Sequence, residues 1–357
     1  MEEHALLDAA RGGDEDAFRR LVEAHQGELR AHCYRMLGSV DDAEDALQDT
    51  LLRAWRGLAR FEGRGSPRAW LYRIATNTSL DAIARRPKRV LPIDHGPAAD
   101  PHLGPGRPLV ESVWVEPYPD ERLGVAEGLA APEARYERRE SVELAFVAAL
   151  QHLPARQRAV LILRDVLGFS AREVAGSLET TTASVNSALQ RARAAIDERL
   201  PDQSQQATLR SLGDARLRGL VEGYMDAWER GDVDAVVALL TEDVAVTMPP
   251  MPTWYRGRDA ARVFLADWAF AKHWAADRGR FEEGRRRVRL LPVRASGQVA
   301  FGAYHWDEQA GRHRPTALQV LTLRGARIAE VAGFVTPAAF PRFGLPDEPP
   351  PRQPRPG

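Results

Sequence analysis

The chain has 357 residues, nearly equal numbers of basic and acidic side chains (49 and 50) and a formal net charge of −1. This length is greater than that of a typical domain with a single hydrophobic core, and it indicates two or three domains of about 100–150 residues. The single cysteine, Cys33, excludes an internal disulfide and a thiolate metal cluster, and we expect no metal site and no cofactor. The sequence lacks an apolar signal core and any apolar stretch of membrane-spanning length, so we expect a cytoplasmic protein without a membrane partner.

Residues 1–90 are predicted to be helical because their apolar residues recur at three- and four-residue spacing. Ser39, with Asp42 three positions later, resembles a capping box at the start of a helix. Residues 41–50 hold five acids and no base, whereas residues 51–90 hold ten Arg or Lys and two acids. We expect the acidic helix to bury one face and to present the other to a partner. The presented residues are Asp45, Gln48, Asp49 and Leu52.

The basic stretch interleaves arginines with aromatic rings, and its second half is predicted as a helix over residues 67–85. Arginines can follow phosphates and aromatic rings can hold unstacked bases, a combination typical of proteins that bind single-stranded nucleic acid. Taken singly, Trp70 and Tyr72 are better explained as core residues, so the interpretation depends on the combined pattern. The candidate DNA contacts are Phe61, Arg64, Arg68, Trp70, Arg73, Asn77, Arg85 and Arg86.

Residues 91–134 are predicted to be a linker, because the stretch from 91 to 135 contains eight prolines and five glycines. Two aromatic residues, Trp114 and Tyr118, stand within it. They are either partly exposed in an extended segment or docked on a neighbouring domain.

Helices are predicted again over residues 135–200, and their layout is that of a helix-turn-helix. Ser170 is a suitable N-cap, residues 179–181 form the turn, and a polar helix follows over residues 182–196. Val185 and Leu189 are expected to face the core. The outward residues suit base edges and phosphates, and they are Ser184, Asn186, Ser187, Gln190, Arg191 and Arg193. The alternative is a structural helix-turn-helix without a DNA role.

A second short linker is predicted over residues 201–208, and residues 209–345 change in character. Helical segments come first and strand-like runs follow, which predicts an α+β domain with an antiparallel meander. Near its end, Phe340 and Phe343 either close this domain or pack on the helical modules. Residues 346–357 are predicted to be a disordered tail.

Three segments together resemble a known family. DAEDALQDTLLRAWRGL, GSPRAWLYRIATNTSLDAIARR and LPARQRAVLILRDVLGFSAREVAGSL with TTASVNSALQRARAAI resemble regions 2 and 4 of bacterial extracytoplasmic-function sigma factors of the sigma-70 family. The resemblance implies two all-α modules and two partners, core RNA polymerase and promoter DNA. It assigns the Asp45 to Leu52 face to the clamp helices of the largest polymerase subunit, the Phe61 to Arg86 stretch to the minus-ten element, and the Ser184 to Arg193 stretch to the minus-thirty-five element.

The chain departs from that family pattern by continuing about 150 residues past the recognition helix. EGYMDAWERGDVDAVVALLTEDVAVTMPP and WYRGRDAARVFLADW resemble SnoaL-like domains of the nuclear-transport-factor-like superfamily, in which a curved sheet and helices form a cone around a pocket. The candidate pocket residues are Tyr224, Asp226, Trp228, Trp254 and His305, with Asp226 as a candidate acid or base. For the aromatic residues, packing in the core is the better explanation, and for His305 a structural histidine with satisfied hydrogen bonds is the better one.

We therefore expect a sigma factor whose C-terminal domain regulates it in cis, and not an enzyme, since the sequence contains no GxSxG, HExxH or GxGxxG motif. One alternative is that the C-terminal domain is an active cyclase or hydrolase, or a small-molecule sensor, fused to a DNA-binding module. Another is a helix-turn-helix repressor that never binds polymerase. The promoter sequence, the ligand and the existence of an anti-sigma protein are not determined by the sequence.

Overall fold

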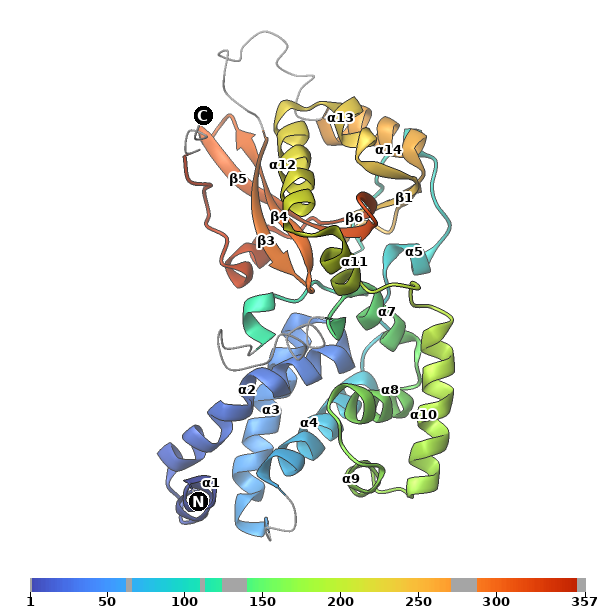
Figure 1. The fold of residues 1–357 in the computed structure, drawn as a ribbon. Helices are drawn as coiled ribbons and strands as arrows, with labels where there is room; N and C mark the ends of the chain where they lie inside the picture. Colours follow the sequence, from blue (N-terminus) through green and yellow to red (C-terminus); the bar gives the residue numbers. More distant parts are fainter. Residues whose placement is uncertain (1, 62–65, 110–112, 124–139, 271–287, 352–357) are drawn as a thin grey trace. The chain divides into compact units, whose positions relative to one another are not determined.

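The computed structural model describes residues 2–61, 66–109, 113–123, 140–270 and 288–351 (Figure 1). The chain forms two compact units, and each contains two separate stretches of sequence. The helical unit comprises residues 1–90 and 115–202, and the sheet unit comprises residues 91–114 and 203–357. The stretch predicted as a single linker is therefore divided between the two units.

The first half of the helical unit contains α1 (Glu2–Arg11), α2 (Glu15–Leu37), α3 (Val40–Gly57) and α4 (Pro67–Ile83). Side-chain oxygens of Asp14, Ser39 and Ser66 cap the starts of α2, α3 and α4, which satisfies amide groups that have no partner within the helix. The reciprocal hydrogen bond of the expected capping box, from the Ser39 amide to the Asp42 side chain, does not form. The Asp42 carboxylate instead accepts a hydrogen bond from Arg89 at 2.6 Å. Burial raises the pKa of the Cys33 thiol to about 12, so this cysteine is an inert core residue.

The second half contains α7 (Leu144–His152), α8 (Ala155–Leu161), the π-helical turn η4 (Ile162–Val166), α9 (Ala171–Ser177) and α10 (Thr182–Asp197). Ser170 and Glu173 form a complete capping box at α9. The buried face of α10 consists of Val185, Leu189, Ala192 and Ile196, which confirms the predicted orientation of this helix.

Buried arginines join the two halves of the helical unit. Arg35 donates to the Ser141 hydroxyl at 2.6 Å, and Arg158 donates to the Gln151 side chain at 2.6 Å and to the Met36 carbonyl. Burial lowers the pKa of Arg158 to about 10, which still leaves it charged at neutral pH. Tyr118 is fully buried in the same unit, with its ring 4.6 Å from that of Tyr34, so this aromatic residue is docked.

The sheet unit begins with α11 (Gln205–Leu212), α12 (Asp214–Arg230) and α13 (Val233–Ala238). Then follow β1 (Leu240–Thr247), β2 (Trp254–Arg256), α14 (Arg258–Phe264) and the π-helical turn η5 (Leu265–Phe270). The remaining strands are β3 (Val288–Ala295), β4 (Gln298–Asp307), β5 (Arg312–Arg324) and β6 (Arg327–Phe334), followed by η7 (Pro337–Phe343).

The sheet has the strand order β2-β1-β6-β5-β4-β3 and curves around the helices α12, α13 and α14 (Figure 1). The predicted antiparallel meander is confirmed for β3 to β6, whereas β1 pairs with β6 in parallel, with Val246 opposite Val331, a pairing that the sequence did not predict. The physical reason is that the chain passes through β2, α14 and the strands β3, β4 and β5 before it returns beside β1 as β6, and such a long crossover permits parallel pairing. The core between helices and sheet includes Tyr224, whose ring stacks on Phe301 at 5.2 Å.

The C-terminal segment packs on its own unit. The ring of Phe340 contacts that of Tyr304 at 5.1 Å, and the Tyr304 hydroxyl donates to the Pro346 carbonyl at 2.8 Å. At Gly302 a Cβ atom would lie 2.6 Å from a Leu345 methyl group, so glycine permits the close approach. Phe340 and Phe343 thus help to close the sheet unit. In the expected disordered tail, the Pro346 carbonyl accepts from Tyr304 and the Pro350 carbonyl accepts from Arg289 at 3.1 Å. Residues 352–357 lie outside the described part.

Glu330, a partly buried residue on β6, makes stability depend on pH. Burial raises the pKa of its carboxyl from 4.5 to about 7, and the neighbouring charge of Asp94 acts in the same direction. The folded chain therefore binds more protons than the unfolded chain between these pH values, and the free energy of unfolding should fall as pH rises through this window. Glu330→Gln still accepts the hydrogen bond from Thr322 and should remove the fall.

We expect Glu330→Gln to stabilise the protein by ~1–3 kcal/mol above about pH 7 and to leave its stability nearly unchanged near about pH 4. Urea unfolding at a series of pH values measures the difference. Parallel profiles for the variant and the parent chain would contradict the assignment.

Candidate functional site

The acidic face of α3 is exposed as predicted. Its four side chains follow one another at spacings of three, one and three residues, so they lie on one side of the helix, and all four are exposed. Leu52 is the unusual member, because a large apolar side chain is 53% exposed at the end of a row of carboxylates. Such a leucine gains free energy when a partner covers it.

The aromatic residues of the basic stretch are used in packing. Phe61 is buried and stacks on Trp70 at 4.8 Å, and both contact an apolar cluster that includes Leu21 and Leu58. The interpretation of Trp70 and Tyr72 as core residues is the one that the structure favours. Arg64 lies outside the described residues.

Two of the predicted DNA-binding arginines contact residues that flank α9. The Arg68 guanidinium lies 4.9 Å from the ring centres of both Tyr72 and Phe169 and pairs with Glu28 at 3.2 Å. Arg73 pairs with Glu179 at 2.9 Å. These arginines are therefore engaged by the second half of the helical unit.

The remaining residues of this predicted set differ in their exposure. Arg85 and Arg86 are exposed and Asn77 is partly buried. Arg86 forms ion pairs with Asp42 and, at 3.7 Å, with Asp45.

All six predicted residues of the recognition helix α10 are exposed, and they lie opposite its buried face. Ser184 stands in the first turn and accepts a hydrogen bond from the Thr181 hydroxyl at 3.0 Å. Arg193 is held by two hydrogen bonds to the Asp165 carboxylate, at 2.8 and 2.7 Å. Side chains in the first turns of α10 are thus presented outward, while Arg193 has an internal partner.

The sheet unit contains a cavity of about 890 Å³ between its helices and the concave face of the sheet. Tyr224 and Trp228 from α12 and His305 from β4 line it, as predicted. Most of the lining is apolar, with Val236, Leu240, Val246, Phe264, Leu265 and Val331 among its members. This is the usual composition of a small-molecule site.

Hydrogen bonds hold the polar side chains Tyr224 and His305 of this wall in place. The Tyr224 hydroxyl donates to the Gln319 side chain at 3.0 Å, and burial raises the pKa of the tyrosine above its ordinary value. His305 Nδ1 lies 2.6 Å from the Thr316 hydroxyl, which itself donates to the Ala303 carbonyl at 2.8 Å. Because the hydroxyl has one proton, His305 must donate through Nδ1, and a neutral ring then carries its acceptor at Nε2.

Two predicted pocket residues do not line the cavity. Asp226 lies two residues from both Tyr224 and Trp228, so helical geometry turns it to another side of α12, where it pairs with Arg230. Trp254 stands on β2, and its indole nitrogen donates to the Gly96 carbonyl at 2.7 Å. The candidate acid Asp226 and His305 therefore do not meet in one site.

Sequence reasoning missed several wall residues. Thr247, Gln319 and the linker residues 103–106 all line the cavity. Alternation along β5 could have indicated Gln319, since it shares a face with Ala317. The linker residues had no comparable signal.

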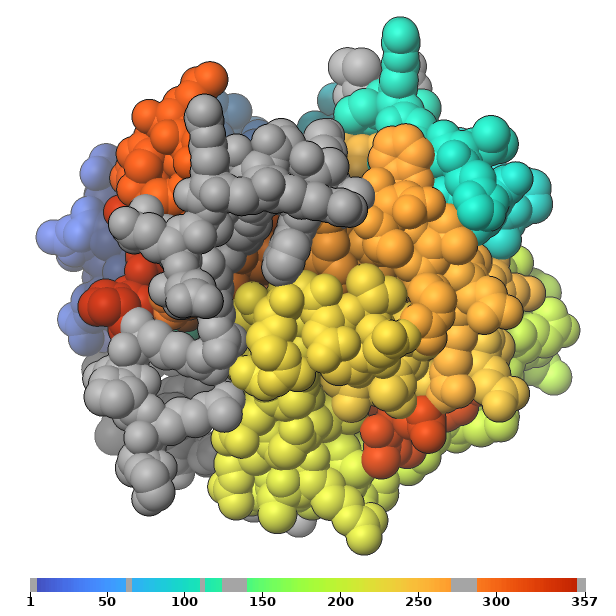
Figure 2. Space-filling view, turned by 90° about the horizontal axis from the view of Figure 1, so that it is seen from above, coloured from blue at the N-terminus to red at the C-terminus, as the bar shows by residue number. Residues whose placement is uncertain are grey.

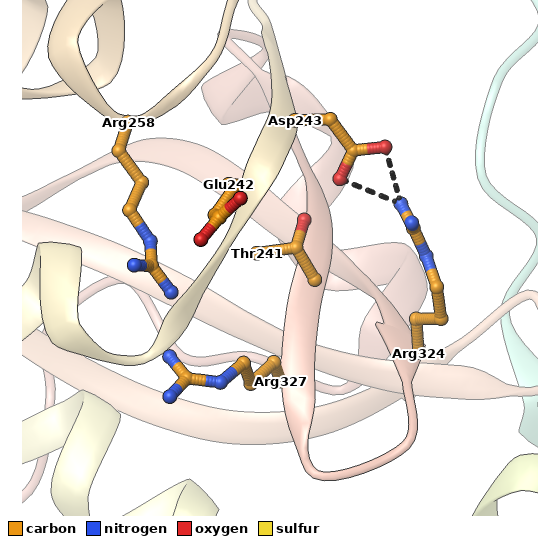
Figure 3. Close-up of a pocket in the computed structure, with 6 residues that line it drawn as sticks. All are labelled: Thr241, Glu242, Asp243, Arg258, Arg324 and Arg327. Atoms are coloured by element: carbon orange, nitrogen blue, oxygen red, sulfur yellow. Dashed lines mark hydrogen bonds and ion pairs between the residues drawn. The ribbon is translucent and has the colours of Figure 1, made fainter.

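A second hollow, of about 520 Å³, lies where β1 begins (Figure 3). Arg324 donates to both oxygens of the Asp243 carboxylate at 2.9 Å and lowers the pKa of that group. Arg258 donates to the Leu240 carbonyl at 3.0 Å, and Arg327 donates to the Ala238 carbonyl at 2.9 Å. These two guanidinium groups satisfy carbonyls where α13 ends and β1 begins, which is a structural role.

Metal and membrane sites were also sought in the described part of the chain. It contains no group of three or more His, Cys, Asp or Glu residues that could hold a metal ion. Among its helices, none combines the length and the apolar character needed to cross a membrane.

Three protein families match consecutive parts of the chain. Sigma-70 region 2 matches residues 21–89, Sigma-70 region 4 matches residues 143–196, and the SnoaL-like domain matches residues 221–331. The ECF RNA polymerase sigma factor SigG of Mycobacterium tuberculosis (strain H37Rv) is 42% identical over 332 residues, which cover 92% of this chain and 84% of SigG. The chain is an extracytoplasmic-function sigma factor of the sigma-70 family.

Two further relatives match different shares of the chain. The RNA polymerase sigma-H factor of Pseudomonas aeruginosa is 28% identical over 56% of this sigma factor and 94% of its own length. The crystal structure of the M. tuberculosis extracytoplasmic function sigma factor SigJ superposes with a TM-score of 0.55 at 21% identity, covering 91% of this chain and 98% of SigJ. The latter likeness concerns the fold alone.

Members of this family are transcription initiation factors, and the sigma factor accordingly binds core RNA polymerase and promoter DNA. Region 2 includes α3 and α4, and region 4 includes the helix-turn-helix of α9 and α10. The assignment of individual residues to these partners stays a prediction.

Proposed function

We propose that the exposed face of α3 binds core RNA polymerase, and that the sigma factor acts where the chromosome is, in the cytoplasm. The observation that supports this assignment is the exposure of Leu52 beside three exposed polar residues, Asp45, Gln48 and Asp49. An apolar anchor surrounded by charges is typical of a specific protein interface, where the anchor contributes affinity and the charges contribute orientation.

Promoter contacts are proposed for two other surfaces. The exposed first turns of α10 read the minus-thirty-five element, and the basic stretch from Phe61 to Arg86 binds the minus-ten element. In the free protein Arg68 and Arg73 contact Phe169 and Glu179 of region 4. These contacts must separate before both arginines can bind DNA, so the described arrangement is a resting state.

We further propose that the sheet unit regulates initiation in cis. The support is its composition, since residues 91–114 belong to the sheet unit although they connect region 2 to region 4. A connecting segment that is anchored in a third unit limits the separations that the two promoter-binding regions can reach.

A charge reversal tests the polymerase surface. Asp49→Arg should weaken binding to core polymerase roughly tenfold or more, because it places a cation in a row of carboxylates at the interface. Glu23→Arg, a reversal at an exposed position of α2, is the matched control and should bind as the parent chain does. Titration of labelled sigma factor with core enzyme measures both affinities, and equal losses for the two variants would contradict the assignment.

Two substitutions on α10 separate base recognition from phosphate binding. Asn186→Ala should cost ~1–3 kcal/mol on preferred minus-thirty-five DNA and relax the preference at one base pair. Arg191→Ala should weaken all sequences alike and reduce the salt dependence of binding, as expected for a phosphate contact. Anisotropy titrations with single-base variants of the promoter measure the difference. If neither variant altered affinity for any sequence, α10 would have no DNA role.

Removal of the sheet unit tests regulation in cis. A chain that ends after Asp202 should retain binding to core polymerase but accept a wider range of spacer lengths between the two promoter elements, because residues 91–114 lose their anchor. Reconstituted transcription on a series of promoters with altered spacers measures this range, and core binding by the shortened chain is the control for folding. Unchanged yields across the series would refute cis regulation.

A further inference from the structure

The segment Gly96–Leu109, here named the strap, is fastened along the sheet unit. Trp254 Nε1 donates to the Gly96 carbonyl at 2.7 Å, and the Ala99 amide donates to the Trp254 carbonyl at 2.8 Å. At the far end, the Leu109 amide donates to the Pro250 carbonyl at 3.0 Å. In Figure 2 the strap, coloured teal, lies against the orange residues of α14 and η5. The strap is thus held at both ends.

The middle of the strap forms part of the cavity wall. Trp268 Nε1 donates to the Pro101 carbonyl at 3.1 Å, and its ring lies so close to Gly104 that a Cβ there would meet it at 2.6 Å. Gly104 also has a φ of 77°, which other residues rarely adopt. Trp268 and strap residues 103–106 all line the cavity. A ligand inside would therefore touch both.

One buried polar group of the cavity wall can bind a ligand through a hydrogen bond. The Thr247 hydroxyl has no hydrogen-bond partner in the described structure, although Thr247 is only 1% exposed. A buried donor without an acceptor is rare in folded proteins, and an acceptor on a ligand would satisfy it. Because the rest of the wall is mostly apolar, the fitting molecule is apolar with a carbonyl or similar acceptor.

Leu103 shows how such a ligand would act on the strap. It lines the cavity, yet 79% of it is exposed, so its apolar surface is left open at the mouth. A ligand that extends to the mouth would cover this side chain and gain hydrophobic contact. The same contact would hold the strap in place.

We propose that the cavity binds a mainly apolar molecule with a hydrogen-bond acceptor, and that the strap is part of this binding site, so that ligand binding and strap docking stabilise each other. By thermodynamic linkage, any ligand that favours the docked strap is itself bound more tightly when the strap is docked. Because the strap lies between region 2 and region 4, ligand occupancy is thereby coupled to the connection between the two promoter-binding regions.

The test uses the full chain and prodan, an apolar naphthalene dye that carries one ketone. We expect prodan to bind with a blue-shifted emission and to slow hydrogen exchange of the strap amides, including those of Ala99 and Leu109, by about fivefold or more. Thr247→Val preserves the shape of the side chain and removes the donor, so it should weaken prodan binding about fivefold.

A matched pair of variants isolates the strap. Leu103→Ser should weaken prodan binding severalfold and reduce the protection of the strap, whereas Ile93→Ser should do neither, since Ile93 is also exposed but does not line the cavity. If prodan failed to bind, or bound equally to the parent chain and Thr247→Val, the ligand site would be refuted. Equal binding by Leu103→Ser with unchanged strap exchange would refute the role of the strap. Neither measurement depends on transcription, so failure here is distinct from failure of regulation in cis.

Discussion

The hydrogen bond from the Val115 amide to the Val90 carbonyl, 3.0 Å long, closes the base of a loop on which the organisation of the protein depends. Both residues belong to the helical unit, whereas the residues between them belong to the sheet unit. The chain therefore contributes to the sheet unit twice, and the connection between regions 2 and 4 is not a free tether. Trp114, the last residue of this loop, is held by its indole group, which donates to the Pro250 carbonyl at 3.1 Å.

The contacts between regions 2 and 4 are of a kind that can separate. Arg158 of region 4 donates to the Met36 carbonyl of region 2, and Arg35 of region 2 donates to the Ser141 carbonyl, two residues before region 4. Burial lowers the pKa of both guanidinium groups. Exposure to water would relieve this desolvation and replace the hydrogen bonds, so separation costs less than opening an apolar core of equal size.

Helix faces could be predicted from the sequence because a helix repeats every 3.6 residues whatever surrounds it. The exposed face from Asp45 to Leu52 and the buried face of α10 follow from that period alone. Tyr224 and Trp228, four residues apart, both line the cavity for the same reason. The same period places Asp226, two residues from each of them, on another side of the helix, so Asp226 was a poor candidate for the same pocket.

The sequence by itself determined the order of the modules, the helical faces and the resemblance to a sigma factor, because these depend on local spacing and short motifs. Only the tertiary structure decided the parallel pairing of β1 with β6, the packing of Phe61 on Trp70 and the place of the strap at the cavity. Residues far apart in the sequence make these contacts, and several alternatives satisfy the same local pattern. The proline- and glycine-rich composition of residues 91–114 indicated an irregular backbone, but the tryptophans that hold this backbone lie more than a hundred residues away, at positions 254 and 268.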